Sequence, residues 1–472
     1  MSQTPACAQW PATRIHFHNT MTRRHQLFEP LVPGEVRLYT CGPTVYDYAH
    51  IGNFRAYVWE DFLRRFLRHR GLKVTQVMNI TDVDDKTIRN AKAAGVSLDE
   101  YTAKYTEAFF EDLATLNIEP AEVYPRATHH IPEMIEICRA LREKGHTYES
   151  QGSLYFKIST FPDYGKLSHI DVSGILPGAR VESDEYEKED ARDFVLWKAR
   201  KDGEPFWPTE LGEGRPGWHV ECSAMSMKYL GETFDIHTGA VDNIFPHHEN
   251  EITQSEAATG KTFVRLWMHC EHLIVDGEKM SKSKGNFFTL RDLTARGLDP
   301  RAIRYFLLTA HYRKQLNFTM DGVAQVASAL TRLEDFRDRI RREPPGRGDE
   351  LLQSVEAARG RFEAALDDDL NTSEALAAMF DLLREGNAAF DRGEGSEAAR
   401  AALSDLLDQF SYLFGIRWRT DSLTDEIEDL IRRREEARKA RDFALADKIR
   451  TDLSDRGILL EDTAQGVRWK RR

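Results

Sequence analysis

The chain has 472 residues, of which 41% are hydrophobic and 30% are charged, and this composition is typical of a globular protein of about three domains. It contains no apolar stretch long enough to cross a membrane and no secretory signal, so we expect a cytoplasmic protein without a membrane partner. A net charge of −12 argues against a protein that coats nucleic acid.

The five cysteines are widely scattered, and their odd number argues against a disulfide framework. We expect a reduced compartment, in which a pair of cysteines would more readily bind a metal than form a disulfide. The cysteines are Cys7, Cys41, Cys138, Cys222 and Cys270.

After a short strand predicted at 15–19, the sequence predicts a strand, a tight turn and a helix. The strand at 37–41 stops at Gly42-Pro43, and residues 50–53 open an amphipathic helix. The N-terminus of a helix attracts phosphate, and glycine at position 52 would allow a nucleotide to approach the backbone. The side chains of His50 and Asn53 could donate hydrogen bonds to it. Two alternatives stay open: His50 only caps the helix, and Cys41 is a buried strand residue.

Residues 73–80 are predicted to form a second strand, which ends in Thr81 and a group of aspartates. Ligands of open α/β sheets bind at the carboxyl ends of strands, so Thr81 and these aspartates are candidates for the site. Alternatively, Asp84 and Asp85 cap the next helix. Helical periodicity follows over 98–116.

Residues of about 125–215 have short elements, frequent glycine and proline and an acidic run, which indicates an insertion into the sheet domain. Beyond it, Pro246 is a candidate helix start. His247 and Glu251, four residues apart, would then share one face of the first turns. A histidine and a glutamate at this spacing usually form a surface hydrogen bond.

The same pair becomes a metal-binding set when Cys41 and Cys222 are added from two other segments. Two thiolates, one imidazole and one carboxylate suit zinc. Ligands so far apart in the sequence must be gathered by the fold. This is expected of a catalytic or substrate-binding zinc rather than of a small structural zinc finger.

A strand predicted at 273–275 precedes a lysine-rich segment at 279–286. Lysines spaced by serine and closed by glycine suit a mobile loop that folds over a polyphosphate and neutralises charge in the transition state. The alternative is a solvated lysine loop. Residues 299–308 and 323–414 are predicted to be mostly helical, and their recurring Leu, Ala and Phe suggest a bundle.

The end of the chain is basic. Residues 432–472 contain thirteen lysines and arginines against eight aspartates and glutamates, a net charge of +5. One or two helices are predicted over 424–457, with Gly457 as a stop. A local basic patch can bind a phosphate backbone, and Trp469 among arginines could stack on an unpaired base or could be one exposed tryptophan.

Two motifs, at 50–53 (His-Ile-Gly-Asn) and 279–283 (Lys-Met-Ser-Lys-Ser), resemble the signatures of class I aminoacyl-tRNA synthetases. Further stretches make the chain similar to the cysteinyl-tRNA synthetase family over about residues 15–472; they lie at 41–47, 79–82, 217–223, 245–251, 299–301 and 459–463. Two departures stand out. Asn53 stands where the class motif most often has histidine, and Thr238 and Ala240 replace glycines.

The resemblance implies an α/β fold, with a Rossmann-like doubly wound parallel sheet, an inserted connective domain, a C-terminal α-helical bundle and a small anticodon-binding domain. The expected parts are the two halves of the catalytic domain (15–125 and 216–278), the connective insertion (126–215), the mobile lysine loop and stem-contact region (279–322), the bundle (323–418) and the anticodon-binding domain (419–472).

The resemblance also implies a reaction. The family activates L-cysteine with ATP to cysteinyl-adenylate and transfers the cysteinyl group to the 3′-terminal adenosine of tRNA(Cys). One zinc ion (Zn2+) per chain would recognise the substrate thiolate, and Mg2+ would accompany ATP. L-cysteine, ATP and tRNA(Cys) are the expected partners of a monomer.

The roles of individual residues are implied by their match to the family motifs. The implied catalytic residues are His50, Asn53, Lys279 and Lys282; the ATP-binding residues are Gly52, His50, Asn53, Asp242 and Lys282; the substrate-binding residues are Gly42, Thr44, Thr81, Trp218 and His237; and the zinc ligands are Cys41, Cys222, His247 and Glu251.

Two other functions share parts of this pattern. A related ligase joins cysteine to a glucosamine-inositol acceptor in thiol biosynthesis but lacks the full anticodon-binding tail, so the basic tail counts against it. A non-catalytic tRNA-binding paralogue would be expected to have lost the lysine loop or the zinc ligands, and both are intact in this sequence.

Overall fold

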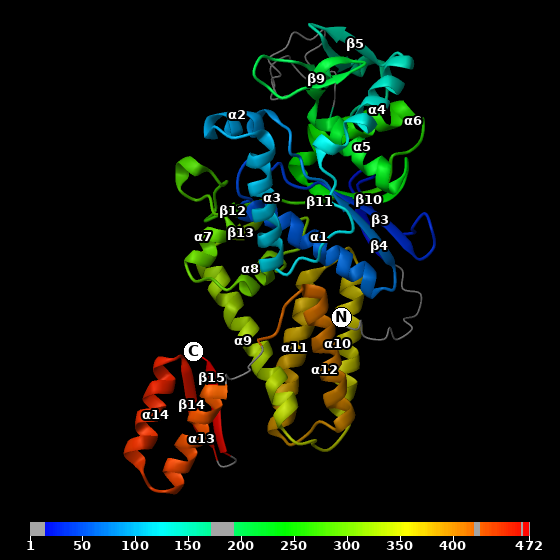
Figure 1. Ribbon diagram of the computed structural model, residues 1–472. Coiled ribbons are helices and arrows are strands. Elements are labelled where there is room, and N and C mark those ends of the chain that lie inside the picture. Colours follow the sequence, from blue (N-terminus) through cyan, green and yellow to red (C-terminus); the bar gives the residue numbers. More distant parts are fainter. Residues whose placement is uncertain (1–14, 171–192, 420–424, 464–465, 472) are drawn as a thin grey trace. The chain divides into compact units, whose positions relative to one another are not determined.

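The computed structural model describes residues 15–170, 193–419, 425–463 and 466–471 (Figure 1). The chain divides into two compact units, of which the first ends at Arg417 and the second comprises Trp418–Arg472. Among the described helices, none combines the length and the apolar character needed to cross a membrane.

A four-stranded parallel sheet lies at the centre of the first unit (Figure 1). Its strands are β3 (Glu35–Thr40), β4 (Lys73–Met78), β10 (Phe234–Ala240) and β11 (Val264–Cys270). They lie in the order β11-β10-β3-β4, and every neighbouring pair is parallel. The strands predicted at 37–41 and 73–80 are therefore confirmed, and they are neighbours in one sheet.

Helices cover both faces of this sheet; they are α1 (Ile51–His69), α5 (Trp218–Leu230) and α6 (Glu249–Thr259). On β10, His237 bonds to Glu251 of α6, whereas its neighbour Thr238 bonds to Glu60 of α1. Because successive residues of a strand point to opposite faces, α1 and α6 lie on opposite sides of the sheet. This is the Rossmann-like doubly wound fold that the sequence predicts.

The start of α1 is fixed by a capping box. Nδ1 of His50 accepts the N–H of Asn53 at 3.2 Å, and Oδ1 of Asn53 accepts the N–H of His50 at 3.0 Å. The interpretation of His50 as a helix cap is therefore confirmed. The cap uses only Nδ1 of His50, so Nε2 stays available for another contact at this end of the helix.

Two helices, α2 (Asp85–Ala94) and α3 (Leu98–Thr115), follow β4, and α3 confirms the helix predicted at 98–116. Asp84 caps α2, because its Oδ1 accepts the N–H of Lys86 at 2.6 Å. Asp85 instead forms an ion pair with Lys198 of the insertion at 2.8 Å. The alternative of a capping role is confirmed for Asp84, and Asp85 anchors the insertion.

The insertion has a helix and an antiparallel sheet of its own, seen at the top of Figure 1. They are α4 (Ile131–Glu143), β5 (Thr147–Ser150), β6 (Ser153–Phe156), β7 (Phe194–Ala199), β8 (Trp207–Thr209) and β9 (Gly212–Pro216). The strand order is β5-β6-β7-β9-β8. The acidic run of the insertion, at residues 182–190, lies outside the described residues.

Small elements flank the central sheet. A hairpin of β1 (His16–Asn19) and β2 (Arg24–Leu27) contains the strand predicted at 15–19. The strand predicted at 273–275 is β12 (Leu273–Val275), which pairs in parallel with β13 (Leu316–Phe318). In the sequence, the lysine segment and the helices α7 (Leu290–Ala295) and α8 (Pro300–Leu307) lie between these two strands.

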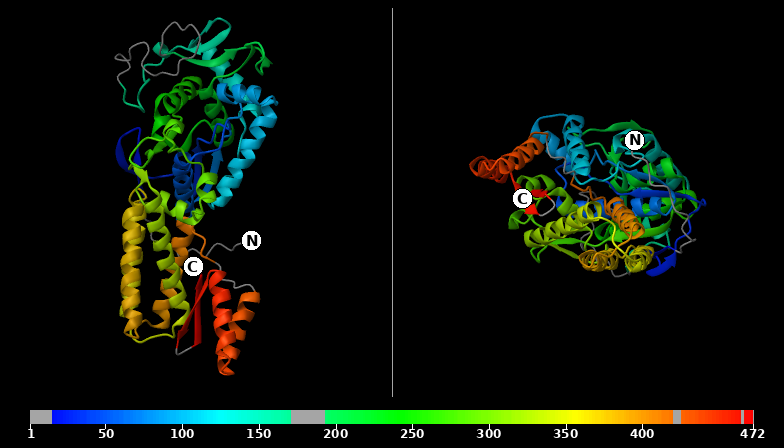
Figure 2. Two further views of the ribbon diagram at one scale, coloured as in Figure 1. Left: turned by 90° about the vertical axis from the view of Figure 1, so that its left-hand side faces the viewer. Right: turned by 90° about the horizontal axis from the view of Figure 1, so that it is seen from below.

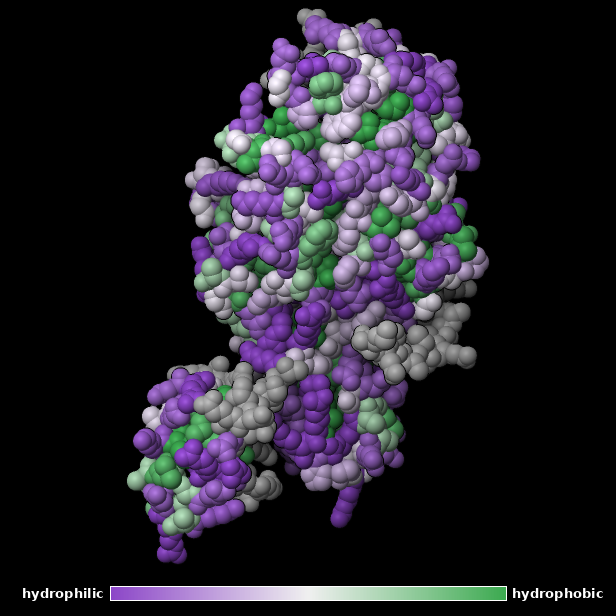
Figure 3. Space-filling view, viewed as in Figure 1, coloured by the Kyte–Doolittle hydropathy of each residue, from purple (hydrophilic) through white to green (hydrophobic). Residues whose placement is uncertain are grey.

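Four long helices complete the first unit, and Figures 1 and 2 show them side by side. They are α9 (Met320–Arg342), α10 (Glu350–Asp367), α11 (Thr372–Asp391) and α12 (Glu397–Phe414). Their recurring apolar residues, such as Leu333, Phe362 and Leu406, are buried between them. The predicted bundle is confirmed, and its surface in Figure 3 is mostly hydrophilic.

The second unit consists of two helices and a hairpin: α13 (Asp425–Lys439), α14 (Phe443–Asp455), β14 (Ile458–Thr463) and β15 (Gly466–Arg471). The prediction of one or two helices is confirmed. Gly457 ends them with a positive φ of 78°, a conformation that favours glycine. The hairpin was not predicted. The side chain of Trp469 lies outside the described residues, so its predicted stacking role stays a prediction.

Candidate functional site

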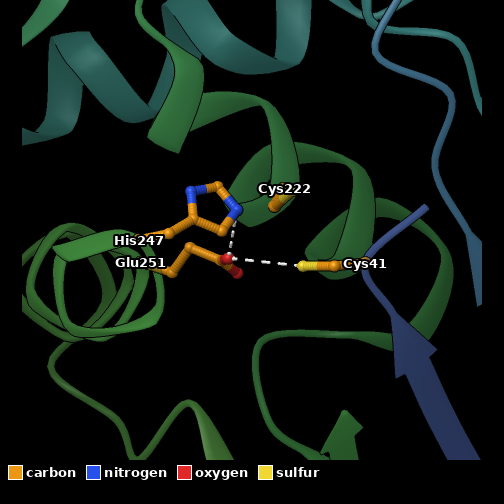
Figure 4. Close-up of side chains that lie close together, drawn as sticks. All are labelled: Cys41, Cys222, His247 and Glu251. Carbon is orange, nitrogen blue, oxygen red and sulfur yellow. Dashed lines mark hydrogen bonds and ion pairs between the residues drawn. The ribbon is translucent and has the colours of Figure 1, made fainter. Parts of the chain in front are cut away.

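Four donor side chains meet beyond the carboxyl end of β3 (Figure 4). Cys41 directly follows β3, Cys222 lies near the start of α5, His247 lies just before α6, and Glu251 lies in the first turn of α6. One ligand atom from each lies within 4.8 Å of the other three. We call these residues the four-donor cluster. It brings together all four residues that the sequence predicts as metal ligands.

The contacts within the cluster are short, and most of it is buried. Nε2 of His247 lies 2.9 Å from Oε1 of Glu251, so the two side chains share one helix face as predicted. Sγ of Cys41, which is half-buried and follows the strand, lies 4.0 Å from the same oxygen. Cys222 is 1% exposed and Glu251 is 0% exposed. Buried groups of this kind must be paired or must bind an ion, because an isolated buried charge is very unfavourable.

The pKa values show how the cluster distributes charge. Burial opposes ionisation of Glu251, but His237 and His247 outweigh it and lower the pKa of this carboxyl to about 2. Burial likewise opposes the charge on His247, but Glu251 and Cys222 raise its pKa to about 10. A hydrogen bond from Cys41 lowers the pKa of Cys222 to about 6. Without a metal, the cluster therefore pairs the Glu251 carboxylate and the Cys222 thiolate with a protonated His247, while the hydrogen bond with Cys222 and burial raise the pKa of Cys41 well above its usual value. A metal ion would displace the protons of His247 and Cys41, because its ligands must be deprotonated.

A second donor group overlaps the first and consists of Cys41, His237, His248 and Glu251. Nε2 of His237 contacts Oε2 of Glu251 at 2.9 Å. Nδ1 of His248 contacts Nε2 of His269 at 2.8 Å. His237, predicted to bind substrate, thus lies behind the Glu251 carboxylate and orients it.

The other predicted substrate residues surround the same strand ends. The ring of Trp218 stacks on that of His247, with a centroid distance of 4.0 Å and an interplanar angle of 17°. Thr44 and Thr81 face each other in a parallel bridge. The Thr81 hydroxyl is 3.1 Å from Oε2 of Glu221. The structure therefore places Trp218 against the cluster and Thr81 on the adjoining segment.

Gly42 brings these segments together. Its N–H donates to Oδ1 of Asn79 at 2.8 Å, and a Cβ at position 42 would lie 1.8 Å from the Asn79 carbonyl oxygen. Any side chain at position 42 would therefore push the two strand ends apart. The structure gives Gly42 a packing role, and its role in substrate binding stays a prediction.

The predicted nucleotide residues gather at the N-terminus of α1. Burial lowers the pKa of His50, while Asp242 raises it and Lys282 lowers it, so both charged groups lie near the imidazole. A Cβ at Gly52 would lie 2.6 Å from Cε of Met280, a residue of the lysine segment. The lysine segment therefore packs closely against the helix end that was predicted to bind phosphate.

The two predicted catalytic lysines differ in their surroundings. Nζ of Lys282 lies 2.7 Å from Oδ2 of Asp47 and 5.1 Å from the ring centroid of Phe287. Lys279 is exposed, and its carbonyl oxygen accepts a hydrogen bond from Asn286. The sequence reasoning did not select Asp47, although an acidic residue in the first βα turn is a natural partner for a lysine loop.

Thr238, which replaces a glycine of the family motif, points to the face of the sheet that α1 covers. Its hydroxyl donates to Oε1 of Glu60 at 2.9 Å, and burial raises the pKa of this carboxyl to about 8. The Thr238 side chain therefore points towards α1 and away from α6.

In the second unit, the end of α13 and the start of α14 form an exposed region. Phe443 is 61% exposed and Leu445 is 39% exposed. Arg438, Lys439 and Arg441 next to them are exposed as well. In Figure 3 this unit shows apolar and hydrophilic groups side by side. A large aromatic residue at the polar start of a helix was the signal that sequence reasoning missed.

Comparisons with known proteins agree over most of the chain. Three family models match: the tRNA synthetases class I (C) catalytic domain over residues 27–328, the DALR domain over 361–417, and the cysteinyl-tRNA ligase anticodon binding domain over 420–469. The cysteine--tRNA ligase of Solibacter usitatus is 52% identical over 97% of this chain and 100% of its own length. That of Brachyspira hyodysenteriae is also 52% identical, over 97% of this chain and 99% of its own length.

A solved structure shares the fold. The methionyl-tRNA synthetase of Mycobacterium tuberculosis in complex with methionyl-adenylate superposes with a TM-score of 0.59 at 18% sequence identity. The match covers 81% of this chain and 90% of that chain. At this identity the similarity shows the fold alone.

The low pKa of Cys222 can be tested in metal-free protein. As the pH rises through about 6, one thiolate should form, which its ultraviolet absorbance reports. An ordinary cysteine titrates near about 8.5. The step should be absent from Cys222→Ala and present in Cys138→Ala, since burial raises the pKa of Cys138 to about 12. A wild-type titration without a step below neutral pH would contradict the assignment.

Proposed function

Because the chain belongs to the cysteine--tRNA ligase family of class I aminoacyl-tRNA synthetases, we propose that its four-donor cluster binds one Zn2+ and thereby selects the amino acid. The chain is a ligase that activates cysteine with ATP and charges tRNA. One observation carries the zinc proposal. Two thiols, one imidazole and one carboxylate from distant parts of the sequence converge on one point.

The donor chemistry favours zinc in this cluster over the overlapping group. Two sulfur donors suit zinc, whereas magnesium and calcium prefer oxygen. In the overlapping group, His237 is bonded to Glu251 and His248 to His269. We assign these histidines to the outer shell, where such partners orient the ligands of a metal.

Zinc gives the site a means to tell cysteine from serine. Shape alone separates two such amino acids by about 1–3 kcal/mol. A thiolate binds zinc much better than a hydroxyl does, because soft sulfur matches the ion. Trp218 and Thr81, with Gly42 and Thr44 between the strand ends, would hold the rest of the amino acid. His237 would act through Glu251.

At the nucleotide end, the residues of this chain align the substrates and stabilise charge. Because Nδ1 of His50 accepts the N–H of Asn53, the neutral imidazole carries its proton on Nε2. This N–H can donate a hydrogen bond to a phosphate oxygen. The N-terminus of α1 with Gly52 and Asn53 adds backbone donors. Asp242 would bind the ribose. The substrate carboxylate then attacks the α-phosphorus, and pyrophosphate leaves.

The lysines would stabilise the negative charge of the leaving pyrophosphate. We propose that the ATP phosphates, accompanied by Mg2+, draw Lys282 from Asp47, and that Lys279 approaches from the same segment. An exposed ion pair such as that of Lys282 with Asp47 is worth only about 0–1 kcal/mol, so a polyphosphate can displace it.

The second unit would bind the anticodon loop. Its match to an anticodon binding domain and its exposed Phe443 among cations support this role. Both features count against the thiol-biosynthesis ligase. The intact donor cluster and lysine segment count against a non-catalytic paralogue. We propose that the protein acts as a monomer in the cytoplasm, where translation consumes charged tRNA.

The zinc proposal predicts a loss of selectivity in Cys222→Ala. In the cysteine-dependent exchange of pyrophosphate into ATP, the variant should have a raised KM for cysteine, and its preference over serine should fall towards the limit of about 1–3 kcal/mol set by shape. The KM for ATP should change little. Wild-type selectivity together with wild-type zinc content in a folded variant would refute the ligand set.

The lysine proposal predicts a change in turnover. Lys282→Ala should lower the kcat of pyrophosphate exchange far more than it raises the KM for ATP, since the amine acts mainly in the transition state. Lys284→Ala is the matched control, because Lys284 pairs with Glu278 in the same segment. If Lys282→Ala raises only the KM for ATP, the lysine is a ground-state binder and the assignment fails.

The anticodon proposal predicts that the two half-reactions separate. Deleting residues 424–472 should leave pyrophosphate exchange nearly intact and severely reduce tRNA charging. Phe443→Ala in the full chain should weaken tRNA binding by about 1–3 kcal/mol, the usual cost of a lost base stack. Binding should also weaken as salt rises. Equal loss of both half-reactions would instead indicate that the segment only stabilises the protein.

A further inference from the structure

The insertion contacts α6 where α6 presents donors of the cluster. Glu249 lies between His247 and Glu251 in the sequence and is 0% exposed. Its carboxylate accepts three backbone N–H groups of the insertion: those of Gly165 at 2.9 Å, Leu167 at 3.1 Å and Ser168 at 2.8 Å. Three N–H donors around a buried carboxylate offset the cost of its burial.

The same segment of the insertion makes two further contacts along α6. The hydroxyl of Tyr164 donates to Oδ1 of Asn250 at 2.7 Å. Lys166 pairs with Glu256, farther along the helix and away from the donors. Residues 164–168 therefore follow α6 over its first turns, and Glu249 and Asn250, which lie between His247 and Glu251 in the sequence, make contacts with them.

A second part of the insertion holds the start of α5, which carries Cys222. The N–H of Gly217, the N-cap residue of α5, donates to the carbonyl oxygen of Leu196 in β7 at 2.9 Å. A Cβ at Gly217 would lie 2.1 Å from the carbonyl oxygen of Val195. The backbone of β7 thus packs directly on this helix end. Figure 1 shows the insertion next to both helices.

The helices that supply Cys222 and Glu251, with His247 just before the second of them, are therefore both fixed by one insertion. A metal site needs its donors held within about 0.5 Å of the required positions. We infer that Glu249 is a positioning residue, through which the insertion fixes His247 and Glu251 for metal binding and thiol selection. This inference rests on the proposed ligand set, and it gives the insertion a role in amino-acid recognition.

The isosteric change Glu249→Gln tests the inference, because an amide N–H2 would replace one acceptor and face backbone donors. Zinc should pass to a competing chelator at a chelator concentration up to about 10-fold lower, the low end of the effect of losing a group bonded to a ligand, because Glu249 acts on the ligands only through the backbone. The KM for cysteine should rise, while the KM for ATP stays within about twofold. The matched control is Lys166→Met, which removes a contact of the same segment away from the donors and should behave like the wild type.

Two more variants separate the possible failures. If Glu249→Gln does not fold, Glu249→Asp keeps the charge but withdraws the oxygens, and it should show the same changes to a smaller extent. Suppose that Cys222→Ala loses zinc but folded Glu249 variants keep the zinc retention and the cysteine KM of the wild type. This result overturns the inference about Glu249 and leaves the ligand set standing. Zinc retained in Cys222→Ala as well overturns the ligand set with it. Equal effects of Glu249→Gln and Lys166→Met would show a contact that only adds stability.

Discussion

The buried carboxylate of Glu251 is the constraint on which the site depends. Its side chain has no exposed surface, and its two oxygens contact His247 and His237 at 2.9 Å each. A charge in such an interior persists only when its partners satisfy both oxygens. His247 precedes the same helix, but His237 belongs to β10, so the helix and the sheet must keep a fixed register. The thiols of Cys41 and Cys222 complete the four-donor cluster.

The proposed zinc cluster and the proposed phosphate site share one turn of the chain. Cys41 ends the strand that brings a thiol to the cluster, and His50 and Asn53 cap the helix that follows. In the proposed assignment, one short βα unit therefore links the zinc cluster to the phosphate-binding helix end. Such a link suits a reaction whose barrier falls mainly by alignment and charge stabilisation.

Much of this could be read from the sequence. The strand–turn–helix at 37–53 and the spacing of His247 and Glu251 follow from local periodicity, and both are present. What was missed depends on long-range packing. Nothing local indicates that Glu249 accepts N–H groups from 165–168, or that Asp47 pairs with Lys282. The β14–β15 hairpin was missed because its charged residues leave little apolar alternation to follow.

X-ray absorption at the zinc edge, with and without bound cysteine, tests the central claim most directly. The account predicts one zinc per chain with two sulfur ligands, one nitrogen and one oxygen, and a third sulfur when cysteine is added. Serine should leave the spectrum unchanged. A zinc-free active protein, or a coordination shell that gains no sulfur from cysteine, would contradict the account.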